Sequence, residues 1–303
     1  MEGNRLKILV TGGLGFIGTN LIKRLVKEGH KVICVDDLST GKKENEIEGC
    51  IYHYESIQRF TSSIEWMDFE DPKNQLDIVY HLAAKARITP SFENPDQYFE
   101  DNIMGTQSVI NLCLKTGAKL IFAGSSSHHS GKLKNPYTFS KAIAEETISL
   151  YQIHYNLKAA IARFYNVYGP HQLEGTEHDT LIGRWLYNIK NNIPCKLYGD
   201  GNKVRDFTHV DDIVDGLIKI METESYNLEA FELGRGDAKS IGEIVEMFGI
   251  TPIFKDNKKG EAFETKLDPF QQKRSRQILG WKPKINIEDY IKNEISSIHS
   301  IIH

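Results

Sequence analysis

Tyr137 and Lys141 are the residues whose types and spacing could do chemistry, because a phenol and an ammonium stand four positions apart. Asn135 and Pro136 just before them are typical of a helix N-cap and a first helical residue, so we expect a helix to begin here. Residues four apart on a helix share one face. A phenol titrates at about pH 10 in peptides, and a nearby ammonium favours its phenolate form. The pair could therefore take a proton from a substrate hydroxyl, although a packing or salt-bridge role predicts the same spacing.

Three consecutive serines, Ser125 to Ser127, follow an apolar segment that is typical of a buried strand. Open α/β sheets place their ligands at the carboxyl ends of the strands. A serine hydroxyl at that end could hold a substrate hydroxyl against the tyrosine. A solvated turn is the other interpretation of a serine run.

The segment TGGLGFIG, residues 11–18, follows another apolar run. Its glycines fit GxGxxG at positions 13, 15 and 18, and GxxGxxG at positions 12, 15 and 18. Missing Cβ atoms let a backbone approach a pyrophosphate, and a helix that begins here would supply free N–H groups. Asp36 ends the next apolar run, where a carboxylate accepts the ribose hydroxyls of NAD and repels the 2′-phosphate of NADP. The sequence therefore predicts NAD rather than a merely structural glycine turn, with Lys42 and Lys43 in a solvated loop.

Alternating strands and helices are expected to position these residues. Apolar runs predict strands over 7–10, 31–35, 77–80, 119–123 and 159–164, and helical spacing predicts helices over 16–27, 95–116 and 136–155. Such alternation is typical of parallel βαβ units. We therefore expect an α/β fold with a doubly wound parallel sheet in residues 1–166, a return segment near 203–222, and a smaller C-terminal substrate domain over 167–303.

Composition excludes several classes of protein. Among 303 residues, 37 basic and 41 acidic side chains give a net charge of −4, which disfavours a nucleic-acid partner. No apolar run approaches the roughly 18 residues of a membrane span, and no signal peptide is evident, so we expect a cytoplasmic protein. The cysteines, Cys34, Cys50, Cys113 and Cys195, form no CxxC and are expected to be reduced thiols rather than disulfides or metal ligands.

Eight ordered motifs together resemble the extended short-chain dehydrogenase/reductases, specifically the NAD-dependent sugar-nucleotide epimerase/dehydratase family. They are TGGLGFIG (11–18), VDDLSTG (35–41), HLAA (81–84), DNIMGT (101–106), SSS (125–127), YTFSK (137–141), RFYNVYGP (163–170) and YGDGNKVRDFTHVDD (198–212). The resemblance covers nearly the whole chain. It implies a Rossmann-type sheet with bound NAD and a nucleotide-sugar substrate, expected to be UDP-linked.

The resemblance also implies roles for individual residues. Tyr137 would remove the proton of a sugar hydroxyl as hydride passes to NAD, and Lys141 would hold the nicotinamide ribose and lower the tyrosine pKa. Ser126 would be the serine partner, because it stands five residues before Gly131. The residues implied for cofactor binding are Gly12, Gly15, Phe16, Ile17, Gly18, Asp36, Ser56, Ile57, Leu82, Ala83, Ala84, Asn102, Tyr137, Lys141 and Tyr165.

The resemblance also implies which residues contact the substrate, and most of them lie in the C-terminal half. Asn166 and Arg205 match positions that contact the nucleotide diphosphate, and a guanidinium binds phosphate at two points. Lys258 stands where the family carries an arginine, and Glu261 could hold the nucleotide ribose. Thr265 stands where galactose-type epimerases that exclude 2-acetamido sugars carry a tyrosine, so a small residue leaves room for an N-acetyl group. The residues implied for substrate binding are Ser126, Asn166, Arg205, Lys258, Glu261, Thr265 and Arg87.

The sequence departs from the family in the loop before Tyr137. Only five residues separate it from Gly131, whereas many relatives carry a longer loop that roofs the site. His128 and His129 lie in this short loop, and we expect them to be loop residues rather than metal ligands or catalysts. Ser56 and Ile57 stand where the family usually has Asp-Ile beside the adenine.

Elimination favours 4-epimerisation of a UDP-sugar through a 4-keto intermediate. A 4,6-dehydratase needs an Asp-Glu pair after the serine, but Ser127 and His128 stand there, and the glutamate usual in decarboxylases is also missing. One alternative is another sugar-nucleotide conversion, by a dehydratase, decarboxylase or reductase. The other is a non-catalytic dinucleotide sensor. UDP-glucose/galactose, their N-acetyl forms and uronic acids remain candidate sugars, and Arg87 could bind a carboxylate or phosphate or lie on the surface. We expect a homodimer that packs the helices near 95–116 and 137–155.

Overall fold

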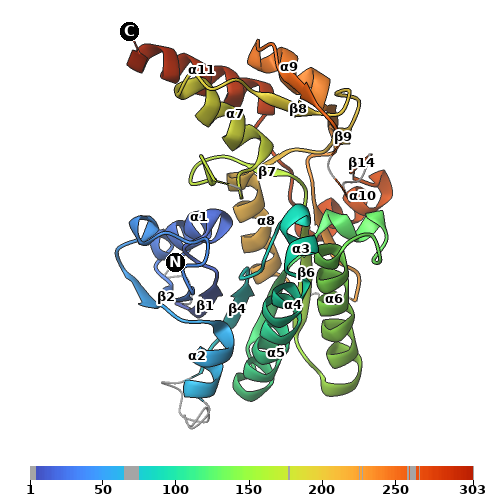
Figure 1. Ribbon diagram of the computed structural model, residues 1–303. Coiled ribbons are helices and arrows are strands. Elements are labelled where there is room, and N and C mark those ends of the chain that lie inside the picture. Colours follow the sequence, from blue (N-terminus) through green and yellow to red (C-terminus); the bar gives the residue numbers. More distant parts are fainter. Residues whose placement is uncertain are drawn as a thin grey trace.

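A parallel sheet of seven strands organises the described chain, with helices on both faces (Figure 1). The structure is a computed structural model that describes residues 5–64, 75–176, 178–224, 226, 228–257, 259, 264–265 and 267–302. The strands of this sheet are β1 (Lys7–Thr11), β2 (Lys31–Val35), β3 (Cys50–His53), β4 (Ile78–His81), β5 (Lys119–Ser125), β6 (Ala159–Phe164) and β11 (Phe231–Leu233). They lie in the order β11-β6-β5-β4-β1-β2-β3, so the order reverses between β1 and β4. Ligands of doubly wound sheets bind at such a reversal, outside the carboxyl ends of the strands.

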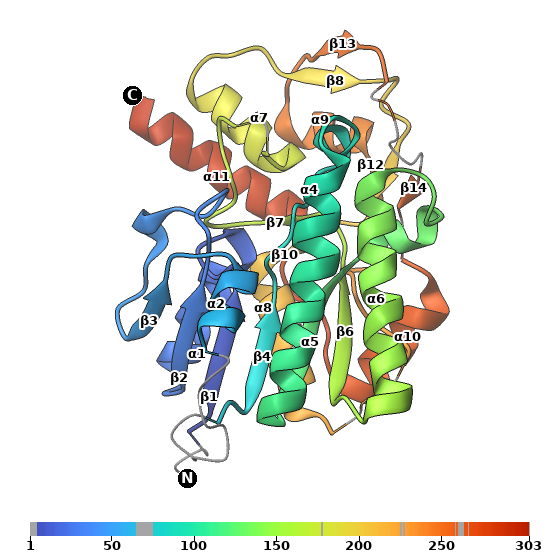
Figure 2. The ribbon, with the colours of Figure 1, turned by 60° about the horizontal axis from the view of Figure 1, so that its bottom comes forward.

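Two helical layers cover the sheet because successive side chains of a strand point to opposite faces. Ile8 and Val10 of β1 are buried in one apolar cluster, and Leu9 is buried in the other. The first layer comprises α1 (Phe16–Lys27), α8 (Val210–Glu222) and α10 (Pro269–Leu279). The second comprises α2 (Ile57–Ser63), α5 (Gly105–Thr116) and α6 (Pro136–Tyr155), and Figure 2 shows α5 and α6 side by side.

The helical stretch over 95–116 is not one regular helix. After α3 (Ile88–Glu93), it runs as α4 (Pro95–Phe99), a π-helical segment η2 (Glu100–Met104) and then α5. π-helical turns inside α-helices are rare and occur frequently at functional sites. The backbone over Glu100–Met104 therefore deviates from the regular periodicity that the sequence pattern predicted.

The C-terminal half forms a lobe with its own apolar core, above the carboxyl ends of the strands (Figure 2). Trp185 of α7 (Leu181–Lys190) packs against Phe248 of α9 (Ile241–Phe248), with their ring centroids 5.5 Å apart. Helix α11 (Ile287–Ile302) contributes Ile291 to the same core. The shorter elements are η1 (Lys43–Asn45), η3 (Ser126–Ser130), β7 (Val167–Tyr168), β8 (Lys196–Tyr198), β9 (Val204–Arg205), β10 (Thr208–His209), β12 (Lys239–Ser240), β13 (Ile253–Lys255) and β14 (Glu264–Thr265).

The C-terminal half also completes the sheet of the first half. Helix α8 occupies most of the expected return segment near 203–222 and packs on α1. Strand β11 then adds the outermost strand beside β6, and α10 packs on β11. The expected boundary at residue 166 therefore does not separate two independent sheets, since α8, β11 and α10 belong to the layers of the first half.

Within the described ranges, no helix is both long and apolar enough to cross a membrane. The four cysteines carry free thiols. No group of three or more metal-binding side chains gathers in that part of the chain.

Candidate active site

A cavity of about 980 Å³ lies where the strand order reverses, between the sheet and the C-terminal lobe. The ends of β1, β2, β4 and β5 contribute its floor, and residues of α7, β8 and β9 line it from the lobe. Tyr137, Lys141 and the glycine turn all line this one cavity. The fold therefore brings together the two features that the sequence singled out separately.

The glycine turn follows the GxxGxxG pattern. Gly12 has a φ of +69°, and a Cβ there would lie 2.7 Å from the Ala83 backbone nitrogen. A Cβ on Gly18 would lie 2.3 Å from the Gly12 carbonyl oxygen. Gly12, Gly15 and Gly18 line the cavity, whereas Gly13 faces the core. Gly15 caps α1 without a side chain, so the first amides of the helix remain available to an anion.

Asp36 presents a carboxylate to the cavity at the end of β2. Its Oδ2 accepts from the Leu14 amide at 3.0 Å and its Oδ1 accepts from the Leu38 amide at 2.9 Å. Burial raises the pKa of Asp36, and these two amides lower it. The carboxylate is thus fixed in orientation, as an acceptor for paired ribose hydroxyls needs to be.

The loop after β4 forms a further wall of the cavity, through Leu82, Ala83 and Ala84. Two hydrogen bonds of Thr11 hold this loop. Thr11 Oγ1 lies 2.7 Å from His81 Nδ1 and accepts from the Ala83 amide at 3.2 Å. Burial lowers the pKa of His81 to about 3, so the imidazole is neutral at physiological pH. Phe16, Ile17, Ser56 and Ile57 line the same cavity, and Ser56 also caps α2.

Asn102 does not itself line the cavity, although the adjacent residue Asp101 does. Its Oδ1 accepts from the Lys85 amide at 2.8 Å, and its Nδ2 donates to the Lys85 carbonyl at 3.0 Å and to Ser140 Oγ at 2.8 Å. The amide is therefore engaged within the protein. The Asn102 side chain therefore links the cavity wall at Lys85 to Ser140 of α6. Asn102 itself belongs to the π-helical segment η2.

Tyr137 and Lys141 lie on the first turns of α6, as their spacing predicts. Asn135 Oδ1 accepts from the Thr138 amide at 2.8 Å and caps the helix. Lys141 Nζ lies 4.2 Å from the centroid of the Phe122 ring. Burial lowers the pKa of Lys141 to about 8, although the Glu145 carboxylate acts in the opposite direction.

Ser125 and Ser126 line the same cavity as Tyr137, and Ser125 is the serine that acts on the pKa of Tyr137. Strand β5 ends at Ser125, whose Oγ accepts from the Ser127 amide at 3.2 Å and so keeps its proton to donate. Burial raises the pKa of Tyr137, while the hydrogen bond with Ser125 and the charge of Arg87 lower it. Ser126 is buried, lines the same cavity and begins the turn η3.

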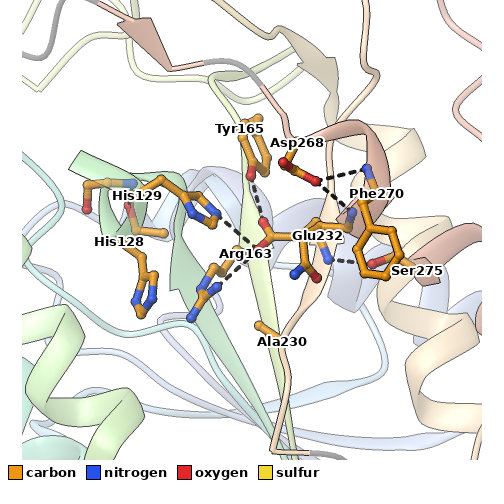
Figure 3. A network of polar contacts seen from close by, with 12 residues as sticks. His128, His129, Arg163, Tyr165, Ala230, Glu232, Asp268, Phe270 and Ser275 are labelled. Atoms are coloured by element: carbon orange, nitrogen blue, oxygen red, sulfur yellow. Dashed lines mark hydrogen bonds and ion pairs between the residues drawn. The ribbon is translucent and has the colours of Figure 1, made fainter. Parts of the chain in front are cut away.

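Tyr165 is buried and does not line the cavity. Phe164 and Asn166 line the cavity on either side of it, as the alternation of an extended chain requires. The Tyr165 hydroxyl instead donates to Glu232 at 2.6 Å (Figure 3). The alternation of side chains along an extended chain would have identified Phe164 as a cavity residue if the sequence had shown where β6 ends.

A buried ion network fastens the short loop before Tyr137. Arg163 of β6 bridges Glu145 at 2.7 Å and Glu232 at 3.0 Å. His128 approaches Glu145 at 3.0 Å. His129 approaches Glu232 at 3.1 Å (Figure 3). The two histidines thus tie η3 to α6 and β11, in the place where many relatives carry a longer loop.

Removing the central cation of this network is expected to destabilise the protein strongly. The side chains of Glu145 and Glu232 are only 4% and 1% exposed, so Arg163→Met leaves two buried carboxylates without their shared guanidinium. We expect the free energy of unfolding to fall by about 3–5 kcal/mol, measured by urea unfolding.

Lys132→Met is the matched control, because the Lys132–Glu146 pair also reaches α6 but its side chains are 55% and 59% exposed. We expect this control to change the free energy of unfolding by less than about 1 kcal/mol. Equal effects of the two substitutions would show that the buried network is not a stabilising centre.

The predicted substrate residues lie partly around the cavity. Asn166, Arg205 and Arg87 line it, and Asn166 Nδ2 donates to the Asp206 carbonyl at 3.0 Å. Strand β14 pairs with β9 so that Thr265 stands opposite Arg205, but the Thr265 side chain, like Lys258 and Glu261, lies outside the described residues. Residues that the sequence reasoning missed include Tyr98, whose ring meets Tyr137 edge-on at 6.3 Å, and Arg184. Their positions depend on the lobe and on α4, and no sequence motif marks them.

The cavity fits a dinucleotide and a hydroxyl substrate side by side. The glycine turn leaves room for a pyrophosphate, Asp36 offers a fixed acceptor, and Tyr137 with Lys141 lies further along the same cavity. These groups can bind NAD and move a proton at an adjacent hydroxyl.

Comparisons with known proteins agree with this geometry. Residues 8–234 match the NAD dependent epimerase/dehydratase family. The UDP-glucuronate 4-epimerase of Thermodesulfobacterium geofontis is 31% identical, over 95% of this chain and 94% of that protein. The UDP-glucuronic acid decarboxylase 1 of Arabidopsis thaliana is 28% identical, over 98% of this chain and 71% of that protein.

Among solved structures, the UDP-glucose 4-epimerase of Thermotoga maritima superimposes with a TM-score of 0.87 at 28% identity, covering 98% of this chain and 100% of that one. Both the sequence match and the fold extend over the sheet, the glycine turn and the Tyr-Lys helix. The chain therefore belongs to the NAD dependent epimerase/dehydratase family, and NAD is its cofactor.

Proposed function

We propose that this protein catalyses the 4-epimerisation of a UDP-sugar through a transient 4-keto intermediate. The observation that carries the proposal is the placement of Tyr137 one helical turn from the buried Lys141, together with Ser125 and Ser126, in the cavity of the glycine turn. Conversion of a UDP-sugar to its C4 epimer with catalytic NAD tests the proposal. Absence of an epimer from UDP-glucose, UDP-N-acetylglucosamine and UDP-glucuronate alike would contradict it.

Each residue of this set has a defined task. Tyr137 accepts the proton of the sugar O4 hydroxyl as a phenolate, and returns it after the ketone has presented its other face. Ser125 donates to the phenolate or to the sugar oxygen. Lys141 carries the positive charge that favours the phenolate. Asp36 and the glycine turn would hold the adenosine end of NAD, which would supply the reversible hydride acceptor for C4.

The groups that elimination or decarboxylation would add are not placed beside Tyr137 in the described chain. Ser126, Ser127 and His128 follow Ser125, and the two carboxylates that meet this loop, Glu145 and Glu232, are both paired with Arg163. This favours epimerisation over dehydration. Decarboxylation is the second candidate, because the similar proteins include a UDP-glucuronic acid decarboxylase.

Loss of the Ser125 hydroxyl is expected to affect turnover more than loss of the Ser126 hydroxyl. Ser125→Ala removes a hydrogen bond that lowers the pKa of Tyr137, so that pKa rises. We expect kcat to fall about 10- to 100-fold. The rise of kcat/KM with pH should also move to higher pH, because a raised pKa means that the Tyr137 phenolate forms only at higher pH. Steady-state kinetics across pH measures both effects.

Ser126→Ala is the matched control, since it removes the same hydroxyl one residue further along the cavity. A larger loss from Ser126→Ala than from Ser125→Ala would restore the assignment that the family spacing suggested.

We also propose a homodimer that packs through α5 and α6. The core of the single chain already buries Ile110, Leu112 and Ile148, so these side chains are not available to a partner. Other apolar side chains of this region remain 50% exposed or more, namely Met104, Leu150, Ile153 and Tyr155. Light scattering tests this assembly.

A further inference from the structure

Arg87 reaches across the cavity from the sheet to the C-terminal lobe. It precedes α3 at the N-cap position, and its side chain makes no capping hydrogen bond. Its guanidinium instead donates to the carbonyl of His178, in the loop before α7. The side chain is half-buried and lines the cavity that also holds Tyr137.

The surroundings of Arg87 leave its charge without a partner carboxylate among the described residues. Tyr137, Tyr98, Asp179 and Arg184 are the charged or titratable groups that act on it. Asp179 is engaged elsewhere, since its Oδ2 lies 2.9 Å from Arg184 Nε and its Oδ1 accepts from Thr176. Arg184 therefore pairs with the Asp179 carboxylate, and Arg87 forms no ion pair with it.

A guanidinium has five N–H donors, and among the described residues Arg87 uses one of them, toward the His178 carbonyl. A half-buried cation with free donors is costly unless an anion meets it. An anionic group of the substrate would supply both the charge and the acceptors, in the two-point geometry that arginine favours.

The position of Arg87 beside Tyr137 indicates which part of a substrate it meets. In the proposed reaction Tyr137 takes the proton from O4 of the sugar. The carbon next to C4 that carries the exocyclic C6 group is C5, whereas the diphosphate is attached to C1 on the opposite side of the ring. The other neighbour of C4, C3, carries a neutral hydroxyl. Beside the tyrosine and away from the diphosphate, C6 is therefore the group that can carry an anionic carboxylate for the guanidinium.

We propose that Arg87 is a specificity-determining residue that binds the C6 carboxylate of a hexuronic-acid sugar nucleotide. This inference rests on the proposed function, because it uses Tyr137 to locate C4. A neutral hydroxymethyl group at C6 would leave the guanidinium without its anion. The substrate class is therefore UDP-linked uronic acids rather than UDP-glucose or its N-acetyl form.

The test compares kcat/KM for UDP-glucuronate and UDP-glucose in the wild type, in Arg87→Gln and in Arg87→Lys. The wild type is expected to prefer UDP-glucuronate, and Arg87→Gln to lower the ratio of the two kcat/KM values about 10- to 100-fold. Arg87→Lys keeps the charge without the planar fork and should give an intermediate ratio. Arg59→Gln is the control, because Arg59 is 82% exposed on α2 and should leave the ratio as in the wild type.

The ratio separates carboxylate recognition from a general effect on the tyrosine. If Arg87 served only to lower the pKa of Tyr137 or to hold the loop at His178, both substrates would lose turnover equally and the ratio would not change. An unchanged ratio, or a wild type that prefers UDP-glucose, overturns the inference.

A binding experiment keeps the inference testable if the proposed reaction fails. Calorimetry with the NAD-loaded Tyr137→Phe protein should show tighter binding of UDP-glucuronate than of UDP-glucose, and adding Arg87→Gln should abolish that difference. Equal affinities would overturn the inference even if the protein is an epimerase. A retained preference without turnover of any UDP-sugar would instead reject the proposed function alone.

Discussion

Replacing Tyr137 with phenylalanine is expected to lower kcat for UDP-sugar epimerisation by about 10²- to 10⁴-fold. The substitution removes the hydroxyl that Ser125 contacts and keeps the ring, whose edge-on contact with Tyr98 supports the fold of α4 against α6. NAD binding should persist, because the glycine turn and Asp36 are untouched. Single-turnover kinetics together with NAD titration measures the two properties separately.

Tyr155→Phe provides the matched control for this experiment. Tyr155 ends the same helix, but its side chain is 59% exposed and does not line the cavity. We expect this variant to turn over like the wild type. A Tyr137→Phe protein that keeps more than about a tenth of the wild-type kcat would show that another group removes the proton.

Substituting Gly18 with alanine is expected to weaken NAD binding at least about 100-fold, since displacements near 1 Å in a binding turn have effects of that order. A Cβ on Gly18 would lie 2.3 Å from the Gly12 carbonyl oxygen and 2.6 Å from the Gly13 Cα. Both atoms belong to the backbone, so the turn itself must move. Calorimetric titration with NAD measures the loss.

Gly242→Ala is the control, because a Cβ at Gly242 meets the Gly201 carbonyl oxygen at 3.6 Å, an ordinary van der Waals distance. Circular dichroism of both variants distinguishes a local change in the turn from global unfolding. A folded Gly18→Ala protein with wild-type NAD affinity would contradict the assignment of the glycine turn as the pyrophosphate site.

The alternating part of the fold was predictable from sequence because its strands are buried apolar runs. Strands over 31–35 and 159–164 and the helix over 136–155 coincide with β2, β6 and α6. Strand β11 was missed, since it has three residues and carries Glu232 at its centre. A glutamate normally indicates an exposed position, and only the contacts of Arg163 and Tyr165 explain its burial there.

The candidate site was predictable where a motif fixes the backbone and less so where an offset of one residue matters. The glycine turn and the Tyr137–Lys141 helix follow from local spacing. Ser125 lines the cavity beside the expected Ser126, and Phe164 lines it in place of its neighbour Tyr165. The end of a strand decides such offsets, and the sequence pattern locates strand ends poorly because alternation continues into the next loop.

The short loop shows how tertiary contacts assign roles that spacing cannot. His128 and His129 were expected to be ordinary loop residues, but they meet Glu145 and Glu232, which lie far from them in the sequence. Those carboxylates are brought together by Arg163 of a strand between them. No local pattern connects these segments of the chain.

Proton NMR of UDP-sugars incubated with the protein and catalytic NAD tests the central claim most directly. The proposed 4-epimerisation predicts a new anomeric signal from the C4 epimer, which grows until the two sugars reach equilibrium. A deoxysugar methyl doublet would indicate dehydration, and a pentose spin system would indicate decarboxylation. Either of these signals, or spectra that remain unchanged with every UDP-sugar, would contradict 4-epimerisation.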